Sequence, residues 1–118
     1  MVENLSKVLA NYVFLSLKTQ NYHWNVTGPN FASLHQMFED QYNDLSTAID
    51  DIAERIRALG EKTPATMVEY TKLNVLSEGN NEYNSTEMLN DLIKSHQQVT
   101  ELLKNCISNA ANNGDVVT

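Results

Sequence analysis

The sequence is poor in helix-breaking residues and in cysteine: its 118 residues include four glycines, two prolines and one cysteine. So few breaks exclude a collagen-like chain and disfavour an all-β chain with many tight turns. The lone Cys106 excludes an internal disulfide. No run of about 18 apolar residues is present, and residues 1–4 lack the features of a secretory signal. We therefore expect a single all-α domain, residues 1–118, that is soluble and cytoplasmic.

Basic residues are also scarce. The sequence has eight Lys and Arg residues and fifteen Asp and Glu residues, which gives a formal net charge of −7. A chain with this balance repels the phosphate backbone of nucleic acids. Residues 1–4, ahead of the first predicted helix, contain Glu3 and no lysine. The composition therefore argues against nucleic acid as a partner.

Apolar residues recur with a helical period in three long segments. The first runs from Leu5 to Val26 and stops where Gly28 and Pro29 cannot continue a helix. The second follows a suitable N-cap at Asn30 and ends at Gly60. Its apolar residues form a nearly heptad seam: Leu34, Phe38, Tyr42, Leu45, Ile49, Ile52, Ile56 and Leu59. Such a helix is expected to pack along its whole length, as in a bundle.

A short helix and the third long helix are predicted to follow. Thr63 and Pro64 have the pattern of an N-cap and a proline at the first helical position, so a short helix is expected from there. Asn84 and Glu87 form a capping-box pattern ahead of the third long segment, which is expected to end near residues 113–114. Because antiparallel bundles usually pair four long helices, either a partner chain supplies the missing wall or a C-terminal helix has been lost.

Side chains that can bind a metal lie on the second segment, directly beside its apolar seam. At about 100° per residue, four of them fall within roughly 100° of one another: His35, Glu39, Asp50 and Glu54. The first two are four residues apart, as are the last two, so each pair lies over one turn. Taken alone, such acidic pairs are usually solvated surface. Three further carboxylates are assigned to that surface outright: Asp40, Asp44 and Asp51.

One chain cannot close a metal centre from these four residues. Glu39 and Asp50 stand about 16 Å apart along a helix, whereas metal–ligand bonds measure about 2 Å. Two copies packed antiparallel about a two-fold axis would bring one copy's His35 to the other's carboxylates. Mixed imidazole and carboxylate ligands suit iron or manganese. His23 is by itself a core or capping histidine, and it becomes a candidate ligand only beside His35.

Residues 21–31 read NYHWNVTGPNF, followed by His35 and Glu39, and residues 50–55 read DDIAER. With these motifs the chain, from about Leu5 to its last residue, resembles the Dps family, the ferritin-like mini-ferritins of starved bacterial cells. The resemblance implies a ferritin-like four-helix bundle with a short helix in the middle connection, assembled into a hollow homododecamer. Family members continue beyond the segment that matches residues 114–118 into a fourth bundle helix. The resemblance therefore also implies that this helix is missing from a C-terminally truncated chain.

The same resemblance implies a di-iron ferroxidase centre shared between two subunits. Its five ligands would be His23, His35 and Glu39 of one subunit and Asp50 and Glu54 of its neighbour. Glu39 stands where better-known members have Asp. The centre would oxidise Fe(II), preferably with hydrogen peroxide, and the Fe(III) would be stored, which protects the cell and its DNA from oxidative damage. Trp24 would absorb stray oxidising equivalents, or pack as an aromatic at the helix end.

Two other functions stay open at this stage. The first is a DNA-binding protein that coats the nucleoid with little catalysis, which the charge of −7 and the absence of a basic N-terminal tail count against. The second is an inactive helical fragment. Without a second subunit, such a fragment has no means of bringing Asp50 and Glu54 to the histidines of a neighbour.

Overall fold

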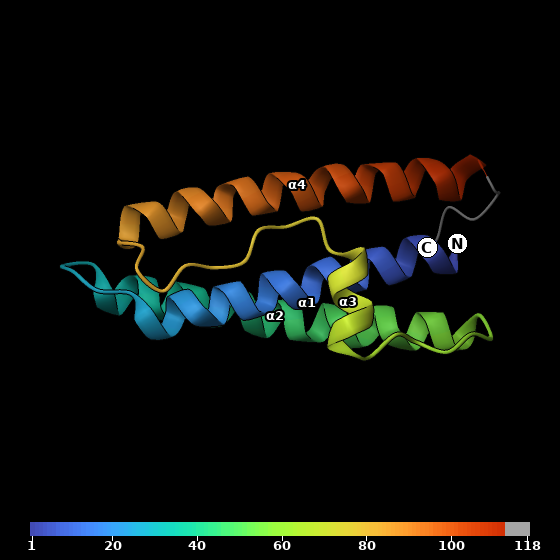
Figure 1. Ribbon diagram of the computed structural model, residues 1–118, viewed down its shortest axis with the longest axis horizontal. Coiled ribbons are helices and arrows are strands. Elements are labelled where there is room, and N and C mark those ends of the chain that lie inside the picture. Colours follow the sequence, from blue (N-terminus) through green and yellow to red (C-terminus); the bar gives the residue numbers. More distant parts are fainter. Residues whose placement is uncertain (113–118) are drawn as a thin grey trace.

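The computed structural model describes residues 1–112 and consists, over that range, of helices alone (Figure 1). The long helices are α1 (Val2–Asn25), α2 (Phe31–Ala58) and α4 (Ser85–Asn112), and α3 (Met67–Leu73) is short. The predicted all-α fold is therefore confirmed. The helix end predicted near residues 113–114 lies outside the described residues. Within them, no helix is long and apolar enough to cross a membrane.

Helix α1 is the centre of the structure. It runs antiparallel to α2 on one side and to α4 on the other, and the segment between α3 and α4 runs back along it (Figure 1). Within residues 1–112, the close backbone contacts between helices are those of α2, α3 and α4 with α1. The position of α4 is therefore set by its contacts with α1 and with the connecting segment.

The hydrophobic core lies where the three long helices and the connecting segment meet. It is formed by Leu15, Tyr22, Val26, Phe38, Leu76, Met88, Leu92 and Val99. Along the seam of α2, only Phe38 and Ile56 are fully buried, and Leu59 is 37% exposed. The other seam residues from Leu34 to Ile52 are half-buried, so the expectation that this helix packs along its length holds except at Leu59. These positions are not fully buried because the close backbone contacts of α2 are with α1, while an open groove lies between α2 and α4.

An open groove of about 650 Å³ separates α2 from α4. Met37 and Gln41 of α2 form one wall, and Leu89, Ile93 and His96 are among the residues of α4 that form the other. Ile93 is 55% exposed there, and the Gln41 Oε1 atom is buried without a hydrogen-bond partner. The bundle described by residues 1–112 is thus open on this side, as the inventory of helices predicts.

The end of α2 confirms the role predicted for Gly60. The Gly60 amide donates to the carbonyl of Arg57 at 3.0 Å, and the Glu61 amide donates to that of Ile56 at 3.4 Å. This pair of bonds is a Schellman motif, which requires a left-handed residue just after the helix. Gly60 has φ of 93°, a conformation that costs a residue without a side chain little.

The start predicted for the short helix was wrong by three residues. Helix α3 begins after Thr66, whose hydroxyl accepts from the Glu69 amide at 3.2 Å and donates to the Glu69 carboxylate at 2.7 Å. Thr63 instead donates from its hydroxyl to the carbonyl of Ala53 in α2 at 2.7 Å. Thr66 therefore caps α3, while Thr63 attaches the loop to the preceding helix.

The capping box at the start of α4 is confirmed, and it supports a first prediction. The Glu87 amide donates to Asn84 Oδ1 at 2.9 Å, and the Asn84 amide donates to Glu87 Oε1 at 3.1 Å. Asn84→Ala should lower the free energy of unfolding by about 1 kcal/mol, because a helix amide loses its acceptor. Urea denaturation measures the change, with the exposed Thr86→Ala as the control. Equal stability of both variants would show that this cap does not hold α4.

Candidate metal centre

Two histidines come together where α1 passes into α2. His23 Nδ1 lies 2.7 Å from the carbonyl oxygen of His35, and His35 Nδ1 lies 2.7 Å from that of His23. A carbonyl can only accept, so both Nδ1 atoms carry the proton and both Nε2 atoms keep a free lone pair. The two rings stack with their centroids 3.7 Å apart and 18° between their planes. This arrangement fixes the tautomer of each imidazole in the form that binds a metal through Nε2.

The turn between the helices and two aromatic rings hold the histidine pair in place. Gly28 adopts φ of 104° in the turn, which lets the chain reverse between α1 and α2 within five residues. The ring of Phe31 stacks on His35 at 5.0 Å, and the ring of Tyr42 meets His23 edge-on at 5.3 Å. His23 is only 6% exposed, so its ring is held on several sides before any ion arrives.

Glu39 lies one helical turn beyond His35 and is half-buried. The amide of Gln36 donates to Glu39 Oε2 at 3.1 Å and to Asp40 Oδ1 at 2.9 Å. No hydrogen bond to Glu39 Oε1 occurs within the described part of the chain, so this oxygen is available to a ligand. The structure therefore places Glu39 on the same end of α2 as the two histidines.

The remaining carboxylates form a separate cluster further along α2. Asp50, Asp51 and Glu54 are exposed, and each offers an oxygen within 4.8 Å of the others. Asp51 is exposed as predicted, but its place in this cluster was not foreseen by the helical wheel. Because α2 is continuous from Phe31 to Ala58, the cluster stands about 16 Å from Glu39. One chain thus carries two separate groups of candidate metal ligands.

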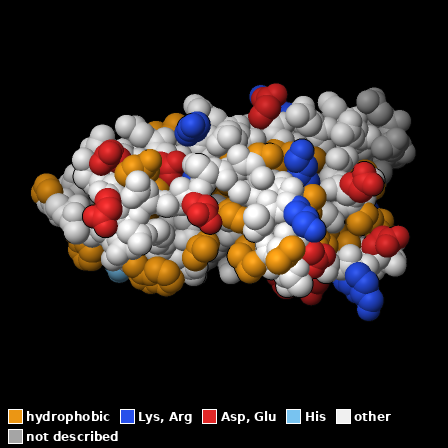
Figure 2. Space-filling model, in the orientation of Figure 1, with side chains coloured by type: hydrophobic (Ala, Val, Ile, Leu, Met, Phe, Trp, Pro, Cys, Tyr) orange, Lys and Arg blue, Asp and Glu red, His pale blue; other side chains and the backbone are white. Residues whose placement is uncertain are grey.

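Trp24, the neighbour of His23, lies at the surface of this chain. Its side chain is 62% exposed, so it does not pack into the core at the end of α1. Figure 2 shows hydrophobic side chains gathered at the end of the molecule where α1 passes into α2, beside the visible histidine. Exposed aromatic rings from this region include Trp24 and Phe31, the latter 43% exposed.

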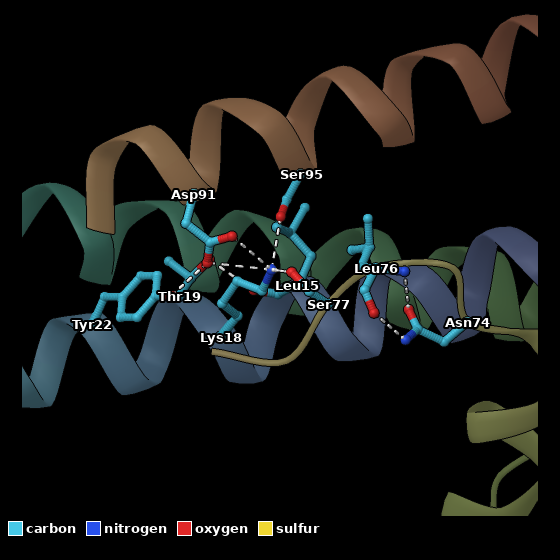
Figure 3. A network of polar contacts seen from close by, with 9 residues as sticks. All are labelled: Leu15, Lys18, Thr19, Tyr22, Asn74, Leu76, Ser77, Asp91 and Ser95. Carbon is cyan, nitrogen blue, oxygen red and sulfur yellow. Dashed lines mark hydrogen bonds and ion pairs between the residues drawn. The ribbon is translucent and has the colours of Figure 1, made fainter. Parts of the chain in front are cut away.

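A buried polar network near the metal-centre candidates was missed by the sequence analysis (Figure 3). Lys18 Nζ lies 3.3 Å from Asp91 Oδ2 and donates to Ser95 Oγ at 2.8 Å. The hydroxyl of Tyr22 donates to the same carboxylate oxygen of Asp91. Lys18 also donates to Ser77 in the connecting segment at 3.3 Å. The network therefore joins α1, α4 and the connection between α3 and α4.

Burial governs the titration of this network. It lowers the pKa of Lys18, an effect that the negative charge of Asp91 opposes. Burial, followed by the hydrogen bond to Asp91, raises the pKa of Tyr22 well above its usual range. A signal was present in the sequence, since Lys18 lies three residues after Leu15 and four before Tyr22, on the core-facing side of α1.

Comparison with known proteins places the chain in a family. A family model described as a ferritin-like domain matches residues 2–118. The "DNA protection during starvation protein 2" of Bacillus anthracis is 36% identical over 118 residues, which cover all of this chain and 81% of that protein. The crystal structure of Dps from Staphylococcus aureus superposes with a TM-score of 0.94 at 36% identity, over 98% of this chain and 78% of that one.

A second solved structure, from Vibrio cholerae O1, is described as a Dps protein of the ferritin-like diiron-carboxylate superfamily. It superposes with a TM-score of 0.91 at 28% identity, over 96% of this chain and 71% of that one. The family match, the relatives and the arrangement of helices agree. The chain belongs to the Dps family of ferritin-like proteins.

Proposed function

We propose that this chain is a ferroxidase of the Dps type, which oxidises Fe(II) between two subunits and stores the Fe(III). The observation that carries this proposal is the division of α2 into two half-sites. A histidine pair with free Nε2 atoms lies at one end together with Glu39, and a carboxylate cluster lies about 16 Å beyond Glu39. The two groups are too far apart to share one ion within a chain, and a second copy in antiparallel orientation would bring the carboxylate cluster of one chain to the histidines of the other.

The proposed roles follow from the ligand types. Iron, the substrate, is bound by Nε2 of His23 and His35 and by Glu39 from one subunit, and by Asp50 and Glu54 from the other. A mixed set of imidazole and carboxylate ligands is typical of iron sites, whereas closed structural zinc sites mostly use cysteine. The negative carboxylates stabilise Fe(III) more than Fe(II), which favours oxidation. Hydrogen peroxide is the preferred oxidant in this proposal, and the di-iron centre is shared.

The exposed aromatic rings beside the histidine pair support the second copy. A contiguous apolar patch on a protein surface commonly marks an interface. Trp24, near the end of α1, and Phe31, at the start of α2, are both exposed, and a two-fold partner has to cover this turn in order to present its carboxylates. In this proposal the two-fold pairs build a homododecamer in the cytoplasm. Trp24 has a second role there as an acceptor of stray oxidising equivalents.

Protection of DNA follows in this proposal from the removal of iron and peroxide. Relatives carry the name of DNA protection during starvation. The net charge of −7 disfavours coating of the nucleoid by this chain, because like charges repel. We therefore place oxidation of iron ahead of DNA binding as the protective activity.

The experiment is Fe(II) oxidation by hydrogen peroxide in the His23→Ala/His35→Ala double variant. Saturable oxidation by the wild-type protein should fall to the rate seen without protein, because each site loses its imidazole ligands. His96→Ala, which removes the third histidine of the sequence from the groove side of α4, is the matched control and should oxidise iron normally. Unchanged oxidation in the double variant would refute the proposed site.

A further inference from the structure

A buried tyrosine lies next to the proposed metal centre in the chain but outside it in space. Tyr22 precedes His23, and its ring points into the core with 0% of its surface exposed. Its hydroxyl donates to Asp91 Oδ2, and that carboxylate is paired with Lys18 (Figure 3). Of the five tyrosines in the sequence, all within the described residues, Tyr22 alone donates to a carboxylate.

This arrangement has a definite chemical consequence. A phenol gives up an electron readily only when its proton leaves at the same time, and that requires a base in hydrogen-bond contact. The carboxylate of Asp91 offers such a base, since it accepts the hydrogen bond of the Tyr22 hydroxyl and is paired with Lys18. The ring of Tyr83, half-buried, lies 6.3 Å from that of Tyr22, which gives a radical a path toward the surface.

We propose that Tyr22 is a proton-coupled radical trap that serves the iron centre, with Asp91 as its proton acceptor. The inference rests on the proposed ferroxidase function and concerns one side reaction, the one-electron reduction of hydrogen peroxide. When one Fe(II) reduces hydrogen peroxide by a single electron, the products are Fe(III), hydroxide and a hydroxyl radical. Tyr22 then gives one electron to the hydroxyl radical, which becomes hydroxide. The O–H bond of Tyr22 breaks, and the proton moves to Asp91.

The trap is reset by the substrate. A second Fe(II) returns the electron to the tyrosyl radical, and Asp91 returns the proton. The sum is two Fe(II) oxidised by one hydrogen peroxide to two Fe(III) and two hydroxide ions, with Tyr22 and Asp91 unchanged. The trap thus completes the two-electron reduction of peroxide without release of the hydroxyl radical.

The first experiment follows tyrosyl radicals by rapid-freeze electron paramagnetic resonance after Fe(II) and hydrogen peroxide are mixed with the protein. The wild type should show a tyrosyl signal, and Tyr22→Phe should lose it. Tyr12→Phe, on the same helix, is the matched control and should retain it. The neutral pair Lys18→Met/Asp91→Asn should also lose the signal, because an amide keeps the hydrogen bond but cannot take the proton. Far-ultraviolet circular dichroism confirms that each variant is helical.

A second experiment needs no iron and separates this proposal from the ferroxidase proposal. Azide radicals made by pulse radiolysis oxidise the iron-free protein, and the rise of the tyrosyl radical should slow in deuterium oxide and in Lys18→Met/Asp91→Asn. A wild-type protein that fails to oxidise iron would refute the ferroxidase proposal. The azide experiment would then still test whether oxidation of Tyr22 is coupled to proton transfer to Asp91. Equal rates in the wild type and the paired variant would overturn the trap. A tyrosyl signal that persists in Tyr22→Phe during iron oxidation would overturn it as well.

Discussion

Asp91→Ala is expected to lower the free energy of unfolding by about 3–5 kcal/mol. The side chain of Lys18 is 1% exposed, and without Asp91 its ammonium group keeps only hydroxyl partners such as Ser95. An uncompensated buried charge is among the most costly defects in a fold. Typical domains are stable by about 5–15 kcal/mol, so a loss of this size is a large share of the total.

The position of α4 adds to the expected loss. Among the described helices, α4 makes its close backbone contacts with α1, and the network of Lys18 and Asp91 lies in that contact. The hydroxyl of Tyr22 also loses its acceptor when Asp91 is removed. The variant should therefore weaken the attachment of α4 to the rest of the chain and not only a local ion pair.

Urea denaturation at neutral pH measures this prediction. Glu101→Ala, an exposed acidic position on the same helix, is the matched control and should change the midpoint little. The neutral pair Lys18→Met/Asp91→Asn should recover much of the lost stability, because it leaves no charge unpaired. If Asp91→Ala proved as stable as the control, the buried ion pair would contribute nothing to folding.

The helices were predictable from the sequence because their signals are local. The seam of α2 repeats within the segment itself. That helix ends at Gly60, where the amides of Gly60 and Glu61 donate to carbonyls three and five positions earlier, respectively. The start of α3 was misplaced because two threonines compete for the cap. Thr66 has the reciprocal glutamate three residues later, whereas Thr63 depends on contact with the carbonyl of Ala53, which no local pattern indicates.

The candidate site was likewise predictable only where its signals are local in the sequence. The i,i+4 spacing indicated which residues of α2 share a turn, and the structure brings His23 to His35 as the turn between the helices requires. The network of Lys18 and Asp91 was not predicted, because the two residues are 73 positions apart and meet only through the packing of α4 on α1. Nor does the sequence of one chain specify the surface on which a second copy completes the carboxylate half.

Subunit mixing is expected to restore iron oxidation to a pair of inactive variants. One variant, His23→Ala/His35→Ala, lacks the histidine half-site. The other, Asp50→Asn/Glu54→Gln, lacks the carboxylate half-site. In a two-fold pair that contains one subunit of each kind, one site receives every native ligand and the other receives neither half. Random pairing makes about half of the pairs mixed, so about a quarter of all sites should be intact.

The two variants are unfolded together and refolded, or produced together in one cell, and oxidation of Fe(II) by hydrogen peroxide is measured per subunit. Each variant refolded alone should be inactive, and Asp51→Asn, from the same carboxylate cluster, should remain active as the control. Recovery near a quarter of the wild-type rate requires that each site takes ligands from two chains. A mixture as inactive as its parts, in the presence of an active wild type refolded in parallel, would mean that each chain builds its own site. The two half-sites on α2, about 16 Å apart, would then serve different purposes.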